Sequence, residues 1–150
     1  HPQTLGSKAH IVLNDATPNI QPMVDMFIGN PEYEEDMIIG NQQAIEAAGG
    51  NCVLVVVDVN KPSITECPDL LRFCKSVVVL DHHRQGTETI ENATLSYVEP
   101  YASSASEMVS EILQYTTSTR SLPVMISRRA CAFTRAFTLV FFSTCWLLPP

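Results

Sequence analysis

Two uninterrupted apolar runs occupy the middle of the chain. Residues 53–57 have the sequence VLVVV and residues 77–80 have the sequence VVVL, with no polar residue inside either run. A strand in a parallel sheet is buried on both faces, so its sequence is continuously apolar instead of alternating. The two runs therefore predict neighbouring parallel strands. The short run HIVLN at residues 10–14, which ends in turn-forming residues, predicts a further strand.

Segments with apolar residues at helical spacing separate these strands. Residues 20–29 predict a helix that ends at a glycine and carries its apolar face on Ile20, Met23, Val24, Phe27 and Ile28. A second helix is predicted at 41–50, with Asn41 as N-cap and a Gly pair at its end. A third is predicted at 63–75, where Ser63 and Glu66 form a capping box. The last is predicted at 103–115, with Ser103 or Ser104 as its N-cap. This order predicts an α/β domain with a mostly parallel sheet and flanking helices.

Polar residues with metal-binding chemistry follow both central strands. Asp58 comes directly after the first run, and Asp81, His82 and His83 come directly after the second. Ligands of parallel α/β sheets bind beyond the carboxyl ends of the strands. A carboxylate and an imidazole at the ends of adjacent strands can share one divalent cation, and a second carboxylate can orient a ring from behind.

A purely structural role is the alternative for each of these residues. A single Asp after a strand is more often a turn or cap residue, but two aspartates at equivalent ends of adjacent strands favour a functional site. The acidic residues within 31–37 are interpreted as a solvated loop, and no function is assigned to His1 or His10.

Charge is unevenly distributed along the chain. All 16 acidic residues lie between Asp15 and Glu111, and residues 1–115 contain only five of the nine Lys and Arg residues. No basic stripe accompanies them, so a long nucleic acid is excluded as a partner. A small anionic substrate would need a local source of positive charge.

The five cysteines are odd in number and form no C-x-x-C pair, which favours reduced thiols in a cytoplasmic setting. Residues 1–10 contain no basic segment followed by an apolar one, and therefore do not resemble a signal peptide.

Asp81-His82-His83 after an apolar strand, together with VVVDVNKPSITECPDLL before it and IENATLSYVEPYASSASEMVSEILQY after it, resembles the DHH phosphoesterase superfamily. Residues 5–115 carry the resemblance, and residues 1–115 are interpreted as a partial DHH domain. Within the superfamily the chain is most similar to the cyclic-di-AMP phosphodiesterases of Firmicutes. Those are membrane-anchored proteins with PAS, degenerate GGDEF, DHH and DHH-associated domains.

The resemblance implies a hydrolase that uses two Mn²⁺ ions to convert cyclic-di-AMP to linear pApA. It implies that Asp58 bridges both ions, that His82 binds one of them, that His83 faces the substrate phosphate and that Asp81 orients an imidazole. It also implies a cytoplasmic domain of a cell-membrane protein that forms homodimers. We expect no membrane contact by the present chain, since its uncharged run at 136–148 is too short to span a bilayer.

Two features depart from the family pattern. The first motif of the family, His-x-x-x-Asp-x-Asp, would lie upstream of residue 5, and its last metal-binding aspartate would follow residue 115 by 20 to 30 residues. Residues 116–150 contain no Asp or Glu and are interpreted as an atypical, out-of-frame tail, with a divergent helix as the alternative. We therefore expect an incomplete metal site and impaired activity. An inactive remnant, or a related phosphoesterase acting on short oligonucleotides or pyrophosphate, stays open.

Overall fold

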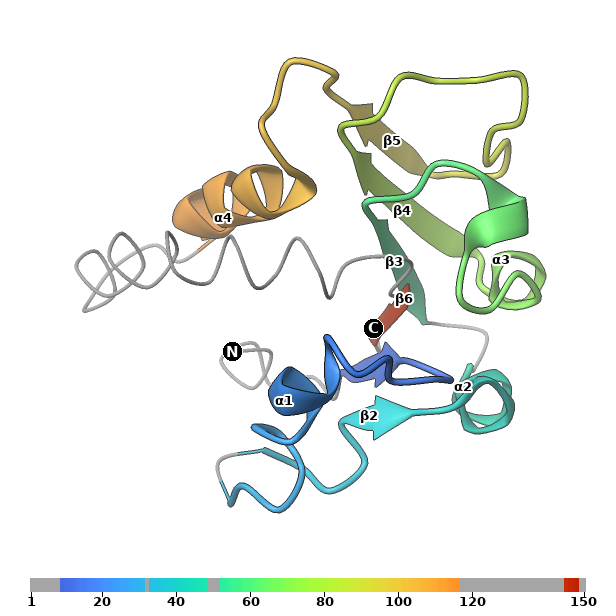
Figure 1. The fold of residues 1–150 in the computed structure, drawn as a ribbon. Coiled ribbons are helices and arrows are strands. Elements are labelled where there is room, and N and C mark those ends of the chain that lie inside the picture. The colour runs from blue at the N-terminus through green and yellow to red at the C-terminus, as the bar shows by residue number, and fades with distance from the viewer. Residues whose placement is uncertain (1–8, 32, 49–51, 117–144, 149–150) are drawn as a thin grey trace.

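The computed structural model describes residues 9–31, 33–48, 52–116 and 145–148. It consists of short helices arranged around one sheet (Figure 1). In chain order the elements are β1 (His10–Val12), α1 (Gln21–Val24), β2 (Ile38–Ile39), α2 (Asn41–Ala47), β3 (Val53–Val57), a 3₁₀ helix (Pro62–Ile64), α3 (Leu70–Phe73), β4 (Ser76–Asp81), β5 (Leu95–Val98), α4 (Ala105–Thr116) and β6 (Cys145–Leu148).

The six strands form one sheet in the order β2-β1-β6-β3-β4-β5. Strands β3, β4 and β5 are parallel neighbours, and Val57 of β3 pairs with Leu80 of β4. The prediction of adjacent parallel strands at 53–57 and 77–80 is thereby confirmed, as is the α/β fold class. Strand β6 runs antiparallel between β1 and β3.

Helices cover both faces of the sheet around β3 (Figure 1). Leu54 and Val56 point to the face covered by α2 and α3, where they belong to the main apolar cluster with Leu70. Val57 points to the opposite face, where it packs with Ala105 of α4. This two-sided burial explains why the β3 sequence has no polar position, and it leaves the carboxyl end of the strand as the place where polar side chains emerge.

The connection from β3 to β4 differs from the predicted helix at 63–75. It contains a 3₁₀ helix at Pro62–Ile64 and then the four-residue helix α3. Pro68 explains the interruption, since it has no N–H to donate and disfavours a helical conformation at the residue before it. The prediction of a Ser63–Glu66 capping box was wrong. Ser63 donates hydrogen bonds to Glu88, while Glu66 accepts a hydrogen bond from the backbone N–H of Asn14.

The two N-terminal helices are also shorter than predicted. Helix α1 spans only Gln21–Val24 and is followed by turns as far as Gly29, so Ile28 is exposed instead of lying on a buried face. Helix α2 begins at Asn41 with Gly40 as its N-cap, and the Oδ1 atom of Asn14 accepts a hydrogen bond from the Asn41 N–H. The predicted Gly stop at 49–50 lies outside the described residues.

Strand β2, absent from the predicted order, pairs with β1.

Helix α4 agrees with the predicted helix at 103–115. The Oγ atom of Ser104 accepts a hydrogen bond from the Glu107 N–H, which identifies Ser104 as the capping residue. The division of the chain into 1–115 and an out-of-frame tail at 116–150 stays a prediction, because most of that tail lies outside the described residues. In the described part of the chain, no helix has the length and apolar character needed to cross a bilayer.

Candidate metal centre

Asp58 lies immediately beyond the last residue of β3 in a strained backbone conformation. Its φ is +66°, the only positive value for a non-glycine residue among those described. Such a conformation is uncommon for residues with a side chain, although Asp and Asn tolerate it better than most. The Asp58 N–H donates to the carbonyl of Leu80 at 2.9 Å, so the β3–β4 hydrogen bonding continues to this residue. The strained turn is therefore held in place by the end of β4.

Asp81 ends β4, and its side chain is fully buried. Its Oδ1 atom accepts hydrogen bonds from the backbone N–H groups of His82 and His83, at 2.9 and 3.3 Å. The same oxygen lies 2.7 Å from Nδ1 of the His83 ring. One buried carboxylate therefore orients both the backbone of the histidine pair and the ring of its second member.

The two imidazoles converge on Asp58 from the end of β4. Nε2 of His82 lies 3.2 Å from Oδ1 of Asp58, and Nδ1 of His83 lies 3.9 Å from the same oxygen. The ring centroids of the two histidines are 4.5 Å apart. Ligand-competent atoms of Asp58, His82 and His83 all lie within 4.8 Å of one another.

This donor set fits a divalent cation. Oδ1 of Asp58 is buried and has no aligned hydrogen-bond donor among the described residues, although it faces two imidazoles. A buried polar atom without a hydrogen bond lowers the stability of the fold unless another group interacts with it. Burial raises the pKa of the Asp58 carboxyl, and the neighbouring His83 and His82 partly oppose that rise. Mixed carboxylate and imidazole ligands suit Mn²⁺, Fe²⁺ or Zn²⁺.

The structure brings together all four predicted site residues, Asp58, Asp81, His82 and His83. Their individual roles as ligands or catalytic groups stay predictions. His10, to which no function was assigned, has Nδ1 2.7 Å from the carbonyl oxygen of Asp36.

Contacts between the loops after β3 and β4 were not predicted. Asn60, which is buried, donates from Nδ2 to the His83 carbonyl at 3.4 Å. Glu88 accepts two hydrogen bonds from Ser63, one from the N–H at 2.9 Å and one from the hydroxyl at 2.8 Å. These contacts join residues 23 to 25 positions apart, so local sequence patterns give no signal for them. They hold the histidine loop against the loop that follows Asp58.

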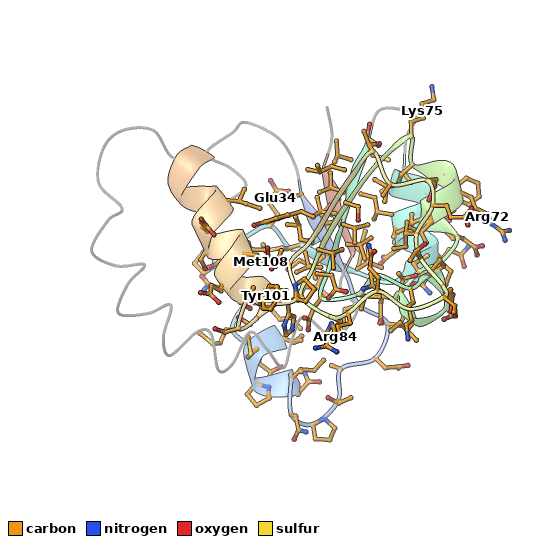
Figure 2. The ribbon with its side chains drawn as sticks, turned by 90° about the horizontal axis from the view of Figure 1, so that it is seen from above. Glu34, Arg72, Lys75, Arg84, Tyr101 and Met108 are labelled. Atoms are coloured by element: carbon orange, nitrogen blue, oxygen red, sulfur yellow. The ribbon has the colours of Figure 1, made fainter. Side chains whose placement is uncertain are left out.

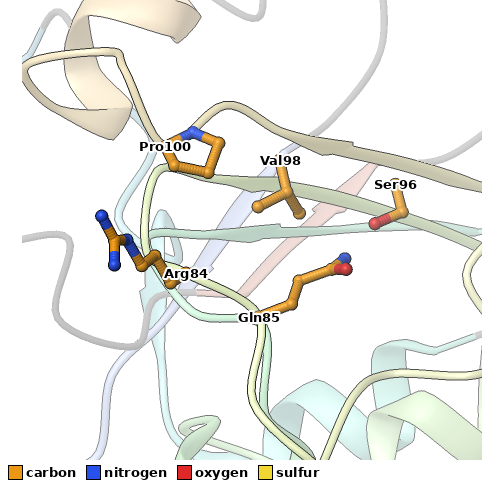
Figure 3. A pocket seen from close by; sticks show the side chains of 5 residues that line it. All are labelled: Arg84, Gln85, Ser96, Val98 and Pro100. Atoms are coloured by element: carbon orange, nitrogen blue, oxygen red, sulfur yellow. The ribbon is translucent and has the colours of Figure 1, made fainter.

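A shallow pocket of about 280 Å³ lies against the loop that follows the histidine pair. It is lined by Arg84, Gln85, Ser96, Val98 and Pro100 (Figure 3). Val98 pairs with Asp81 across β4 and β5, which places the pocket at the same carboxyl edge of the sheet. Arg84 follows His83 directly in the sequence and lines this pocket, whereas Arg72 and Lys75 lie on another side of the domain (Figure 2). Sequence analysis did not identify Arg84 as a pocket residue because an exposed arginine carries no distinctive pattern.

Fold and site together define an α/β domain with a candidate metal centre at the carboxyl edge of its parallel strands. The model of the DHH family, N-terminal domain, matches residues 5–133. The chain belongs to the DHH family, as the Asp81-His82-His83 motif predicted.

Three curated bacterial proteins are similar to part of the chain. It is 41% identical over 102 residues to the cyclic-di-AMP phosphodiesterase GdpP of Bacillus subtilis, an alignment that covers 65% of this chain and 16% of that protein. It is 47% identical over 74 residues to GdpP of Geobacillus thermodenitrificans, covering 49% of this chain and 11% of that protein. It is 42% identical over 78 residues to the cyclic-di-AMP phosphodiesterase PdeA of Listeria monocytogenes, and that alignment covers 52% of this chain and 12% of that protein. The chain thus spans less than a fifth of the length of these relatives.

Proposed function

We propose that this chain is part of the catalytic domain of a metal-dependent phosphodiesterase that hydrolyses cyclic-di-AMP to linear pApA. The observation that carries the proposal is the convergence of Asp58, His82 and His83 on one point at the carboxyl edge of β3 and β4. The names of the similar proteins support the choice of substrate.

In this proposal Asp58 and His82 hold the metal. Oδ1 of Asp58 and Nε2 of His82 are 3.2 Å apart and approach from separate strands, so one cation can be bound by both. We propose manganese as the cation, and Asp58 and His82 would be among the residues that hold two ions in the complete site. When bound, such cations lower the pKa of a coordinated water to about 7 and polarise phosphoryl oxygens.

His83 and Asp81 form the second part of the proposed machinery. Nδ1 of His83 contacts the carboxylate of the fully buried Asp81. Nε2 is therefore the ring nitrogen that can contact the substrate phosphate or donate a proton to the leaving-group oxygen. A buried carboxylate behind an imidazole selects the ring tautomer and fixes its orientation. Asp81 is thus proposed to act through His83.

The pocket beside the histidines supports a small anionic substrate. Its volume of about 280 Å³ is just below the usual range for whole small-molecule ligands of about 300–1,000 Å³, so it suits one portion of a dinucleotide. Arg84 at its rim would contact phosphate, while Val98 and Pro100 offer apolar surface. We further propose that the intact protein is a homodimeric membrane protein with this domain in the cytoplasm.

Activity of the present chain is proposed to be impaired. The described residues gather three ligand-competent side chains, while two cations with about four or more ligands each need a larger set. An inactive remnant is the competing interpretation, and a related phosphoesterase specific for short oligonucleotides or pyrophosphate is another.

The test is to purify the 150-residue chain and to incubate it with Mn²⁺ in three separate reactions. The substrates of these reactions are cyclic-di-AMP, a short oligoribonucleotide and pyrophosphate. We expect slow formation of pApA from cyclic-di-AMP and its loss in Asp58→Asn. Bound Mn²⁺, measured by electron paramagnetic resonance, separates an impaired site from an absent one. Faster hydrolysis of pyrophosphate or of the oligoribonucleotide would contradict the proposed substrate, and absence of Mn²⁺ binding would contradict the metal site in this chain.

A further inference from the structure

Two cysteines meet at the edge of the sheet opposite the metal centre. Cys52 directly precedes β3, and Cys74 follows α3, two residues before β4. Because β3 and β4 are parallel, both thiols lie at the amino edge, whereas Asp58 and His82 lie at the carboxyl edge. Neither cysteine has a role in the proposed function.

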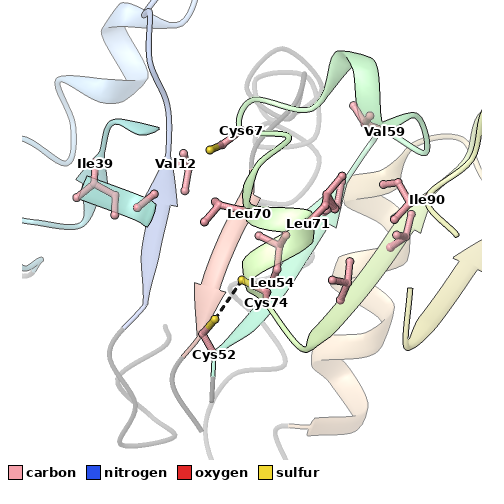
Figure 4. Packing of buried hydrophobic residues seen from close by; sticks show 14 residues of the cluster. Val12, Ile39, Cys52, Leu54, Val59, Cys67, Leu70, Leu71, Cys74 and Ile90 are labelled. Carbon is pink, nitrogen blue, oxygen red and sulfur yellow. Dashed lines mark hydrogen bonds between the residues drawn. The ribbon is translucent and has the colours of Figure 1, made fainter. Parts of the chain in front are cut away.

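The two sulfur atoms are unusually close. Sγ of Cys52 donates to Sγ of Cys74 at 3.1 Å (Figure 4). Apolar heavy atoms in contact are usually about 3.5–4.0 Å apart. The covalent S–S distance is about 2.05 Å, so a bond requires the sulfurs to approach by only about 1 Å. Both residues flank regular elements instead of lying inside them.

We propose that Cys52 and Cys74 form a dithiol site that a hydroperoxide converts to an intramolecular disulfide. This inference does not depend on the proposed function. Exposures of 5% for Cys52 and 4% for Cys74 restrict access to small oxidants, and hydrogen peroxide is the simplest.

The reaction balances in two steps. One thiol, as thiolate, attacks the peroxide; an S–O bond forms, the O–O bond breaks, and water or an alcohol leaves with the thiol proton. The second thiol then attacks the resulting sulfenic sulfur; the S–S bond forms, the S–O bond breaks, and water leaves. In total the two thiols lose two electrons and two protons to the hydroperoxide.

The disulfide would cross-link the two ends of the connection between the central strands β3 and β4. It would join the chain just before β3 to the chain just before β4 and close a loop over the 3₁₀ helix and α3. Closing a loop of this size restricts the unfolded chain and stabilises the folded one. The metal ligands are five or more residues away along each strand and stay untouched.

Cys67 is a matched internal control. It belongs to the same apolar cluster as Cys52 and Cys74 and is even less exposed. Burial raises the pKa of the Cys67 thiol, which disfavours the reactive thiolate. Oxidation directed by the geometry of the folded chain should therefore leave Cys67 reduced.

The experiment treats the folded 150-residue chain with hydrogen peroxide, blocks the remaining thiols, and maps peptides by mass spectrometry. Digestion with trypsin and a Glu-specific protease places the cysteines in five separate peptides, residues 47–66, 67–72, 73–75, 130–135 and 136–150. We expect 47–66 joined to 73–75 with loss of two hydrogens, and release of both peptides by dithiothreitol.

Three comparisons make the result decisive. Cys67→Ala should keep the cross-link and Cys74→Ala should lose it, while the oxidised wild-type chain should unfold at a temperature higher by on the order of 10 °C. Should Cys74→Ala fail to fold, the wild-type peptide map alone decides. A cross-link through Cys67, a cross-link formed only after denaturation in urea, or a lower unfolding temperature on oxidation would overturn the proposal.

Discussion

Nδ1 of His83 lies 2.7 Å from Oδ1 of Asp81, a carboxylate with no solvent exposure at the end of β4. The same oxygen accepts the backbone N–H groups of both histidines, while the buried Oδ2 of Asp81 has no hydrogen-bond partner in the part of the chain that the structure describes. Charge-assisted hydrogen bonds of this kind are about twice as strong as neutral ones. Asp81 therefore organises the histidine pair before any ligand binds.

Replacing Asp81 by Asn should disturb His83 more than the metal ligands. The amide keeps an acceptor oxygen but loses the charge that selects the His83 tautomer, so we expect the hydrolysis rate to fall by about 10–100-fold. Nitrogen-15 NMR of the ring provides a readout that does not depend on activity. Unchanged His83 resonances together with unchanged activity would contradict the positioning role of Asp81.

Asp58→Asn should separate stability from metal binding. Asn tolerates the φ of +66° and removes a buried carboxylate, so the metal-free chain should unfold at the same or a slightly higher temperature. The variant should lose the stabilisation that saturating Mn²⁺ gives the wild-type chain. Thermal unfolding with and without Mn²⁺ measures both effects. The exposed Asp15→Asn is the control, and an unchanged Mn²⁺ response in Asp58→Asn would contradict the proposed ligand.

Arg84→Gln should weaken binding of the dinucleotide. Arg84 lines the pocket beside the histidines, and losing one exposed, charge-assisted contact to phosphate should lower the affinity by about tenfold. Titration with cyclic-di-AMP in the presence of Mn²⁺ measures this change. Arg72→Gln removes the same charge from another side of the domain and should leave the affinity unaltered (Figure 2). Equal losses in both variants would indicate a general electrostatic effect instead of a specific contact.

The central strands could be predicted from sequence because burial on both faces leaves a direct mark on composition. Runs 53–57 and 77–80 have no polar position, and they became β3 and β4. Strand β2, at Ile38–Ile39, is too short to show a period, and its existence depends on hydrogen bonds to β1. The predicted helix at 63–75 failed because Pro68 outweighs the apolar spacing around it.

The site was predictable in its residues but not in its geometry. Parallel strands bring their carboxyl ends together, which suffices to place Asp58 beside the histidine pair. Which histidine Asp81 holds, and the contact of Asn60 with the His83 carbonyl, depend on loop conformations that no local pattern specifies.

Glu88→Gln should reduce stability in a pH-dependent manner. Hydrogen bonds from the Ser63 hydroxyl and N–H hold the pKa of Glu88 below its ordinary value. A carboxyl with a lowered folded-state pKa stabilises the fold above its unfolded pKa of about 4.3, and the contribution disappears as the pH falls through the folded value. Wild type should therefore be slightly more stable than Glu88→Gln at pH 7, and the two should converge near pH 3. Urea denaturation at both pH values tests this, and a difference that persists at pH 3 would exclude the ionised contact as its cause.

Strand β6 provides a direct test of the proposed boundary at residue 115. Its backbone pairs with three residues of β1 on one side and four of β3 on the other, and no direct pairing between β1 and β3 exists among the described residues. A chain ending at residue 144 would leave facing edges of β1 and β3 without their hydrogen bonds, and exposed strand edges promote association. At about 0.5–1.5 kcal/mol for each hydrogen bond, we expect a loss of at least about 3 kcal/mol in the free energy of unfolding. Chemical denaturation measures the loss, and a chain ending at residue 148 is the matched control because it keeps all of β6. If the chains ending at residues 144 and 116 are as stable as this control, β6 adds nothing to the fold and residues 1–115 are the domain by themselves.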